Sequence, residues 1–162
     1  MAHEKRHREP AKKLRAGRFY FDDVVPGNWY EIPSITLRTE QIDRFAELSG
    51  DCFAIHMSDD AARELGFPRR VAHGLLVLSL TDGLKNRAET TFHAVASLGW
   101  NWSFGKPVFA GDTLSALICV MAKRETRKTG RGIIQLAFEV TNQDGTIVQS
   151  GFNELMVVRQ TR

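Results

Sequence analysis

The sequence predicts an α+β fold in which one long apolar helix precedes a series of antiparallel strands. Residues 74–88 are apolar around most of a helix circumference, which is typical of a helix enclosed by other elements. Residues 97–104 and 134–140 alternate apolar and polar side chains, the pattern of half-buried strands. Gly111-Asp112 and Asp144-Gly145 are turn signals between strands. We therefore expect the strands to curl around the helix.

Shorter elements follow from local patterns. A helix should run from Thr39 to Gly50, because apolar residues recur at i, i+3 and i+4 and glycine readily ends a helix. These apolar residues are Ile42, Phe45 and Ala46. A second, short helix should begin at Ser58, since two aspartates follow where the helix dipole favours negative charge. Further strands are expected over residues 35–37, 114–121 and 155–158.

The composition is that of one folded domain. The chain has 162 residues, of which 43% are hydrophobic and 25% charged, as is usual for a domain with its own core. Cys52 and Cys119 belong to no CxxC or Cys/His cluster, so neither a disulfide framework nor a zinc site is indicated. The longest strongly apolar run, residues 75–80, is too short to cross a bilayer. No signal-peptide pattern opens the chain, so we expect a cytoplasmic protein without a membrane partner.

Positive charge is concentrated at the N-terminus. Residues 1–18 carry seven of the 22 lysines and arginines but only two of the 19 acidic residues. We interpret residues 1–18 as a basic, disordered tail and residues 19–162 as a single folded domain. The domain without this tail is slightly acidic, so binding to nucleic acid is not indicated.

The segment from Ser49 to His56 carries the clearest candidate residues for chemistry. Asp51 and His56 are five residues apart, which would separate them by about 140° on an α-helix. A loop can bring them together, and they lie between the expected helix end at Gly50 and the helix start at Ser58. A carboxylate and an imidazole that converge can hold one water molecule and accept its proton. The alternative is that the two side chains only cap helices or bind backbone amides.

A second candidate site opens the long apolar helix. Gly74 would be its first residue, and the first amide groups of a helix point outward with positive character. A glycine also lets a ligand approach the backbone closely, so this helix start could stabilise a developing oxyanion. The alternative is a glycine needed only for tight packing. His73 precedes it and could orient the loop or contact a substrate.

Three blocks of sequence, in their order and spacing, resemble the MaoC-like, R-specific enoyl-CoA hydratase family. They are Ser49-Gly50-Asp51 with His56, then Val71-Ala72-His73-Gly74-Leu75, then Pro107-Val108-Phe109-Ala110-Gly111-Asp112. The similarity covers residues 19–159. It implies a hotdog fold, in which a bent antiparallel sheet wraps a long central helix. It also implies a homodimer with active sites between the subunits, and two such dimers could pair further.

The resemblance implies the reversible addition of water to a 2-enoyl-CoA, which gives a 3-hydroxyacyl-CoA. Asp51 and His56 would hold the catalytic water, and the amide of Gly74 would bind the thioester oxygen. Coenzyme A is then part of the substrate, and no metal or redox cofactor is expected. The alternatives are a hotdog acyl-CoA thioesterase and a catalytically inactive subunit that binds acyl thioesters.

The chain departs from the family pattern at two places. Phe53 and Ala54 replace the Asn and Pro that usually stand between the two dyad residues, and Phe53 could narrow or redirect the acyl pocket. Asp82 stands eight residues after Gly74, where related hydratases often carry serine. An acidic residue there hints at a polar or carboxylated acyl group.

Two further features have both a functional and a structural interpretation. Arg69 and Arg70 precede the second block and could contact the phosphates of coenzyme A, because guanidinium groups suit phosphate oxygens. Exposed loop arginines are more often only solvated. The aromatic side chains that alternate within residues 97–104 could line a ligand tunnel, but the simpler interpretation is core packing against the long helix.

Overall fold

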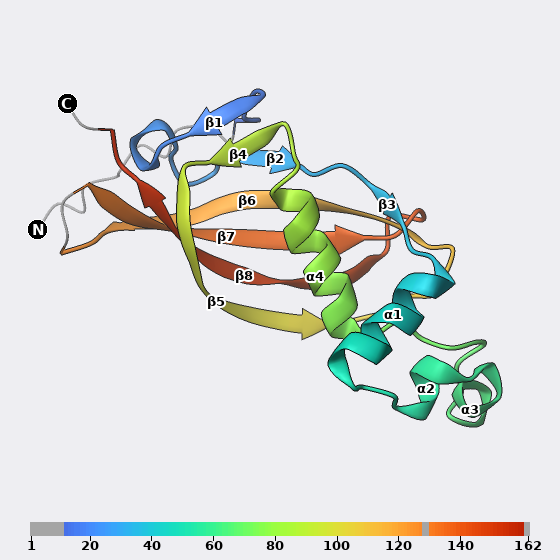
Figure 1. Cartoon of the computed structure of the whole chain (residues 1–162). Helices are drawn as coiled ribbons and strands as arrows, with labels where there is room; N and C mark the ends of the chain where they lie inside the picture. The colour runs from blue at the N-terminus through green and yellow to red at the C-terminus, as the bar shows by residue number, and fades with distance from the viewer. Residues whose placement is uncertain (1–11, 128–129, 161–162) are drawn as a thin grey trace, which may run out of the picture.

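The centre of the computed structural model, which describes residues 12–127 and 130–160, is a bent antiparallel sheet (Figure 1). Its strand order is β2-β6-β7-β8-β5, and β3 also pairs with β6. The strands are β2 (Trp29–Glu31), β3 (Ile35–Thr36), β5 (Ala94–Phe104), β6 (Thr113–Glu125), β7 (Arg131–Thr141) and β8 (Ile147–Val158). Helix α4 (Gly74–Lys85) lies across one face of this sheet. The predicted α+β arrangement of a long helix and consecutive antiparallel strands is confirmed.

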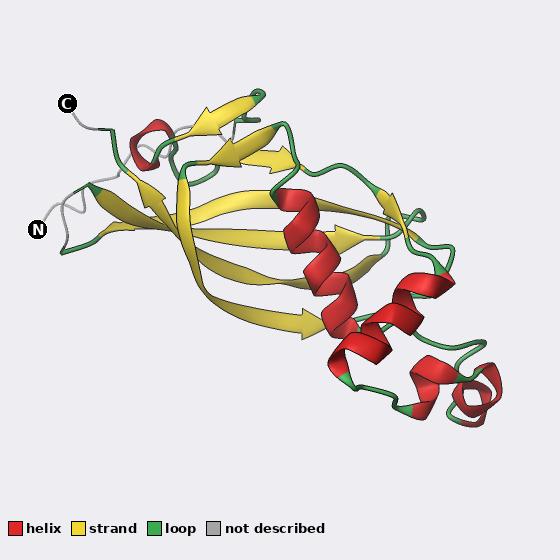
Figure 2. Ribbon diagram, viewed as in Figure 1, coloured by secondary structure: helices red, strands yellow, loops and turns green. Residues whose placement is uncertain are grey.

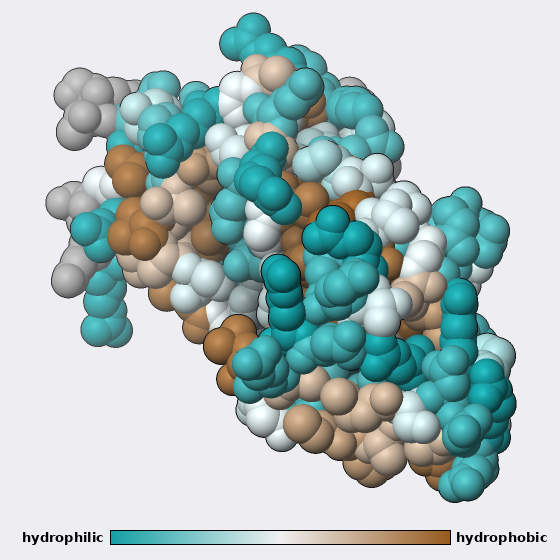
Figure 3. Space-filling model, turned by 45° about the vertical axis from the view of Figure 1, so that its right-hand side comes forward, coloured by the Kyte–Doolittle hydropathy of each residue, from teal (hydrophilic) through white to brown (hydrophobic). Residues whose placement is uncertain are grey.

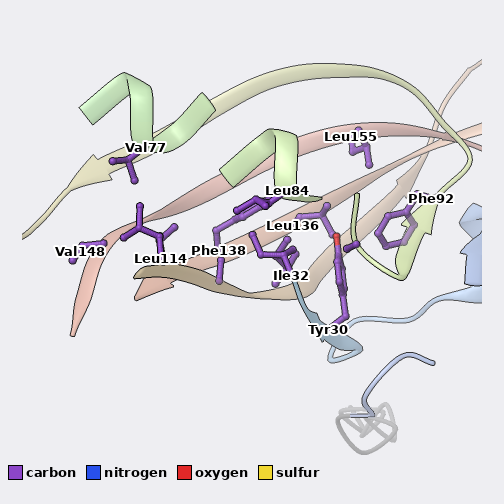
Figure 4. Packing of buried hydrophobic residues seen from close by; sticks show 14 of the residues in the cluster. Tyr30, Ile32, Val77, Leu84, Phe92, Leu114, Leu136, Phe138, Val148 and Leu155 are labelled. Atoms are coloured by element: carbon purple, nitrogen blue, oxygen red, sulfur yellow. The ribbon is translucent and has the colours of Figure 1, made fainter. Parts of the chain in front are cut away.

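The hydrophobic core lies between α4 and the inner face of the sheet. Val77 and Leu84 of the helix and Leu136 and Phe138 of β7 are all buried in it (Figure 4). The opposite side of α4 is open, because Leu75 is 57% exposed. The expectation that this helix is enclosed on all sides is therefore wrong for the single chain, although it holds for the side that faces the sheet. The helix also ends at Lys85, three residues earlier than expected.

The pairing of β5 with β8 brings residues far apart in sequence face to face. Trp102 lies opposite Gly151, and Phe104 lies opposite Gln149. A Cβ atom at Gly151 would lie 2.6 Å from the indole ring of Trp102, so the glycine leaves the space that this ring needs. The end of β5 lies beside the start of α4, because the Phe104 ring is close to Gly74.

Three short helices gather at the end of the molecule where α4 begins (Figures 1 and 2). They are α1 (Thr39–Ser49), α2 (Ala54–Met57) and α3 (Asp59–Glu64). Gly50 ends α1 with a φ of 76°, and the Ser58 side chain caps α3 by accepting a hydrogen bond from the Ala61 amide. Both predicted boundaries are confirmed. Helix α2 was expected as loop, because a single helical turn is too short to show a periodic pattern.

The N-terminal segment contacts the domain earlier than expected. Strand β1 (Gly17–Phe19) pairs in parallel with β4 (Thr90–Phe92), and the Leu14 amide donates a hydrogen bond to the Trp29 carbonyl at 2.8 Å. A 3-10 helix (Phe21–Asp23) follows. The prediction of a disordered tail through residue 18 is therefore wrong for residues 12–18, while residues 1–11 lie outside the described part. Pairing with strands so distant in sequence leaves no local signal.

Candidate active site

Asp51 and His56 converge with a third side chain, His73. One potential acid–base atom from each of the three lies within 4.8 Å of the others. Asp51 lies in the loop after α1, His56 lies on the one-turn helix α2, and His73 immediately precedes α4. The structure thus brings the predicted pair together, because the chain turns at residues 50–53 instead of continuing as a helix.

The hydrogen bonds of His56 leave one ring nitrogen for chemistry. Its Nδ1 atom lies 2.7 Å from the Val71 carbonyl oxygen. A carbonyl oxygen only accepts, so Nδ1 carries the proton of the neutral ring and Nε2 keeps its lone pair. The Val71 amide in turn donates to the Ile55 carbonyl at 2.9 Å. These bonds hold the imidazole in one orientation with a basic nitrogen free.

The Asp51 carboxylate is exposed and helps to shape its own loop. Its Oδ1 atom accepts a hydrogen bond from the Phe53 amide at 3.3 Å, and the Asp51 amide donates to the Ser49 hydroxyl at 3.2 Å. The structural interpretation of Asp51 as a ligand for backbone amides is therefore correct in part. A carboxylate with two oxygens can make this bond and still accept another from a water molecule.

His73 ties the dyad loop to the start of α4. Its side chain is only 1% exposed, and its Nε2–H donates to the Asp51 carbonyl oxygen at 2.8 Å. Its ring stacks on that of His56, with 3.9 Å between the ring centroids and 29° between the ring planes. Within the described part of the chain its Nδ1 atom is buried without a hydrogen-bond partner. His73 thus orients the loop, one of the two roles considered from the sequence.

The geometry of the three side chains suits acid–base chemistry better than metal binding. Two imidazoles and one carboxylate are a common set of metal ligands. Nδ1 of His56 and Nε2 of His73 already donate to carbonyl oxygens, so a metal ion could bind only at Nε2 of His56 and Nδ1 of His73. Because the rings are stacked, in-plane lone pairs on nearly parallel rings do not aim readily at one central ion.

Gly74 begins α4 at the same place. Its amide belongs to the first turn, whose N–H groups have no acceptors within the helix. A Cβ atom here would lie 2.9 Å from three ring carbons of Phe104, so the close approach of the ring requires glycine. The Gly74 carbonyl oxygen accepts a hydrogen bond from the Gln149 side-chain amide at 3.0 Å.

One cavity of about 420 Å³ contains the dyad and the helix start. Its volume lies in the usual range for small-molecule sites. Asp51, His56, His73 and Gly74 line it together with residues that sequence reasoning missed, and the latter include Phe104, Lys106 and Gln149. A larger cavity of about 890 Å³ lies beside residues 12–20, but none of the candidate site residues lines it. The smaller cavity is therefore the candidate active site, because the candidate chemical groups converge on it.

The remaining candidates lie around this cavity or away from it. Phe53 is exposed, and its ring and that of His56 form an edge-type pair with 6.3 Å between the ring centroids. Arg69 stacks over the ring of Phe109, at 5.3 Å. Arg70 is bound to two carboxylates, since its guanidinium pairs with Asp43 at 2.9 Å and its amide donates to Asp59. Of the two arginines, Arg69 is thus the one without a carboxylate partner in the described structure.

Asp82 does not line the cavity. It lies eight residues along α4 from Gly74, about 12 Å along the helix axis. Its carboxylate pairs at 2.6 Å with Lys85, whose side chain is only 6% exposed. Burial raises the pKa of the nearby Tyr30 hydroxyl, and the negative charge of Asp82 raises it further. In this structure Asp82 therefore neutralises a buried lysine, and the hint about the acyl group remains a prediction.

The central helix and the bent antiparallel sheet define a hotdog fold. A Mycobacterium tuberculosis protein described as a double hotdog fold matches 91% of this chain and 46% of its own, with a TM-score of 0.79 and 23% identity. Residues 23–141 match the MaoC like domain, so the chain belongs to the MaoC-like family. A monoamine oxidase regulatory protein from Archaeoglobus has a TM-score of 0.82 at 26% identity, over 94% of this chain and 100% of that one.

Curated relatives match the same region. Protein MaoC of Klebsiella aerogenes is 38% identical over 120 residues, which are 74% of this chain and 35% of that protein. The (R)-specific enoyl-CoA hydratase of Aeromonas caviae is 32% identical over 111 residues, which are 68% of this chain and 79% of that protein. The chain spans about half (52%) of the mitochondrial 3-hydroxyacyl-[acyl-carrier-protein] dehydratase of Arabidopsis thaliana.

Among the helices of residues 12–127 and 130–160, none is both long and apolar enough to span a membrane.

Proposed function

We propose that the protein is a hydro-lyase that adds water reversibly to a 2-enoyl-CoA and gives a 3-hydroxyacyl-CoA. The observation that carries the proposal is the convergence of Asp51, His56 and the start of α4 on one cavity. This arrangement offers a water-binding pair and an oxyanion-stabilising group to a single substrate. Relatives named as enoyl-CoA hydratases and dehydratases support the reaction class.

The chemistry follows from the free groups of the site. The thioester oxygen would lie against the exposed amides at the start of α4, which draw electron density from the double bond. A water molecule between the Asp51 carboxylate and Nε2 of His56 would give its oxygen to C3 of the acyl group. The dyad would take up one proton of that water and pass it on to C2, while the other proton stays on the new 3-hydroxyl group, so the dyad returns to its starting state. The same groups, run in reverse, would dehydrate a 3-hydroxyacyl thioester.

The coenzyme A portion would extend from the cavity past positive side chains. Lys106 lines the cavity, and Arg69 lies in the loop that leads to α4. An ammonium or guanidinium group is suited to phosphate oxygens. The 3′,5′-ADP part of coenzyme A carries such phosphates, so these two residues are the proposed contacts. Arg70 contributes less, because Asp43 already occupies its guanidinium.

The exposed edge of the sheet suggests how a homodimer would form. Strand β5 ends the strand order and carries exposed apolar side chains, among them Val95, Leu98 and Phe104. Figure 3 shows that apolar surface interrupts an otherwise hydrophilic face. Pairing of β5 with the same strand of a second copy would satisfy its free backbone groups and cover these side chains. Since Phe104 lines the cavity, the partner would also border the active site.

The test measures two readouts with crotonyl-CoA as substrate and distinguishes three outcomes. A hydratase removes the double-bond absorbance, a thioesterase releases free thiol, and a binding subunit does neither. Asp51→Asn and His56→Ala should each lower hydratase turnover by about 10²- to 10⁴-fold, the usual contribution of a general acid–base group. Asp60→Asn, which changes an exposed carboxylate on α3, should leave turnover unchanged. Near-normal turnover in both dyad variants would show that the assigned dyad is wrong.

A further inference from the structure

One buried polar side chain of the cavity, Gln149, has no part in the chemistry described so far. It lies on β8 and is only 3% exposed. Its Nε2 group donates a hydrogen bond to the Gly74 carbonyl oxygen at 3.0 Å. Its Oε1 atom accepts one from the indole N–H of Trp102 at 2.8 Å. One side chain therefore connects β5, β8 and the first residue of α4.

The surrounding packing holds Gln149 and the helix start together. Phe104 lies opposite Gln149 across the β5–β8 pair, and its ring lies against Gly74. Trp102 lies opposite Gly151, whose missing side chain leaves space for the indole. The same two strands thus contact the first peptide of α4 through an apolar ring and through a hydrogen-bonded amide.

The hydrogen bond acts on the part of α4 that would bind the thioester oxygen. The Gly74 carbonyl belongs to the peptide group that continues into the Leu75 amide. In an α-helix this carbonyl already accepts the amide of the residue four positions later, and its second lone pair is available to Gln149. A peptide plane held from two sides fixes the direction of the first-turn amides, which lack acceptors within the helix.

We propose that Gln149 is a positioning residue that sets the orientation of the oxyanion-binding start of α4. This inference rests on the proposed hydratase function, and it assigns to Gln149 no contact with the reacting atoms. An amide is the side chain that fits, because it donates to the carbonyl of Gly74 and accepts from the indole of Trp102 at once. A carboxylate would lose the donor, and an apolar side chain would lose both bonds.

The test replaces the amide while keeping its size. Gln149→Met and Gln149→Glu should lower kcat for crotonyl-CoA hydration by roughly 10- to 100-fold with KM nearly unchanged, because a small misplacement of a positioning group has an effect of this size. Trp102→Phe leaves the bond to Gly74 in place and should lower kcat by a smaller factor. Gln149→Glu matches the native side chain closely in shape, so it provides the measurement if Gln149→Met does not fold.

Asn153 offers a matched control on the same strand. It is fully buried, and its side-chain amide donates to the Ser97 hydroxyl at 2.7 Å and to the Gly99 carbonyl at 3.0 Å, both of which belong to β5 and not to α4. Asn153→Leu should lower the melting temperature but leave kcat close to the native value. Equal losses of kcat in Asn153→Leu and Gln149→Met, at matched stability, would overturn the positioning role. Native kcat in both Gln149 variants would overturn it as well.

A second readout keeps this inference separate from the proposed function. Hydrogen exchange of the backbone amides of residues 77–79 reports how firmly the first turn of α4 is held. These amides should exchange faster in Gln149→Met than in Asn153→Leu. If the native protein lacked hydratase activity, the proposed function would fail, and the exchange comparison would still decide whether Gln149 holds the helix start. Unchanged exchange in Gln149→Met would refute it.

Discussion

Replacing Gly74 by alanine separates the chemical role of the helix start from its structural role. The added methyl group would lie 2.9 Å from three carbons of the Phe104 ring, which is too close for undisturbed packing. Overpacking of this kind usually costs about 1–3 kcal/mol. Because Phe104 is 58% exposed and its ring can turn away, we expect Gly74→Ala to lower the free energy of unfolding by only about 1 kcal/mol. For a chain of this size that is a fall of roughly 2–4 °C in melting temperature.

The effect on activity should be much larger than the effect on stability. The methyl group would be attached next to the Gly74 amide and would narrow the approach of the thioester oxygen to that N–H group, and a lost oxyanion donor lowers kcat by about 10²- to 10³-fold. Thermal unfolding and hydration of crotonyl-CoA are the two assays. Gly83→Ala, on the same helix, is the control, because a Cβ atom at that position would meet nothing within 4 Å. The Gly83→Ala variant should gain up to about 1 kcal/mol in the free energy of unfolding and keep native turnover.

A double variant identifies the cause of the loss. Phe104→Ala combined with Gly74→Ala removes the steric conflict, so it should abolish the stability penalty attributed to the ring. Turnover should remain low, since the methyl group still stands beside the amide and narrows the approach to it. Recovery of turnover in the double variant, or native turnover in Gly74→Ala alone, would refute the reasoning that a substrate atom must approach this backbone.

Two other predictions concern charged groups outside the cavity. Asp82→Ala leaves the buried Lys85 ammonium unpaired and should destabilise the fold by about 2 kcal/mol, below the roughly 3–5 kcal/mol of a fully buried pair because the Asp82 side chain is 38% exposed. Denaturant unfolding measures this, and Asp82→Ala with Lys85→Met should recover most of the loss. The hydrogen bond from Arg159 holds the pKa of Asp22 below its ordinary value of 3.8. The stabilisation is therefore present above pH 3.8 and lost as the pH falls through the lowered pKa, and Asp22→Asn should weaken this dependence in thermal unfolding scans.

The sequence predicted well where local patterns carry the information. The apolar periodicity of α4, the alternation along β5 and β7, and the helix boundaries at Gly50 and Ser58 all follow from interactions within a few residues. The dyad loop could be inferred for the same reason, since a helix end and a helix start enclose it. Comparison with the family then extended these local signals to a complete hotdog fold.

Elements that depend on partners distant in the sequence could not be predicted from local patterns. Strands β1, β2 and β4 have three residues each, too few for a periodic pattern, and they form only because other segments pair with them. Residues 12–18 were misassigned for this reason. Asp82 was expected near the acyl group. Its partner Lys85 lies only three residues further along the same helix, but the burial of that lysine depends on the fold of the whole chain.

Residue type and helix periodicity are local properties, so the amino-acid sequence alone reveals which chemical groups the protein has and where the long helix begins. Which of these groups meet depends on tertiary packing. His73 reaches the carbonyl of Asp51 across 22 residues, and Gln149 reaches that of Gly74 across 75. Such contacts depend on how the sheet bends around the helix, and that is settled by packing of the whole chain rather than by any one segment.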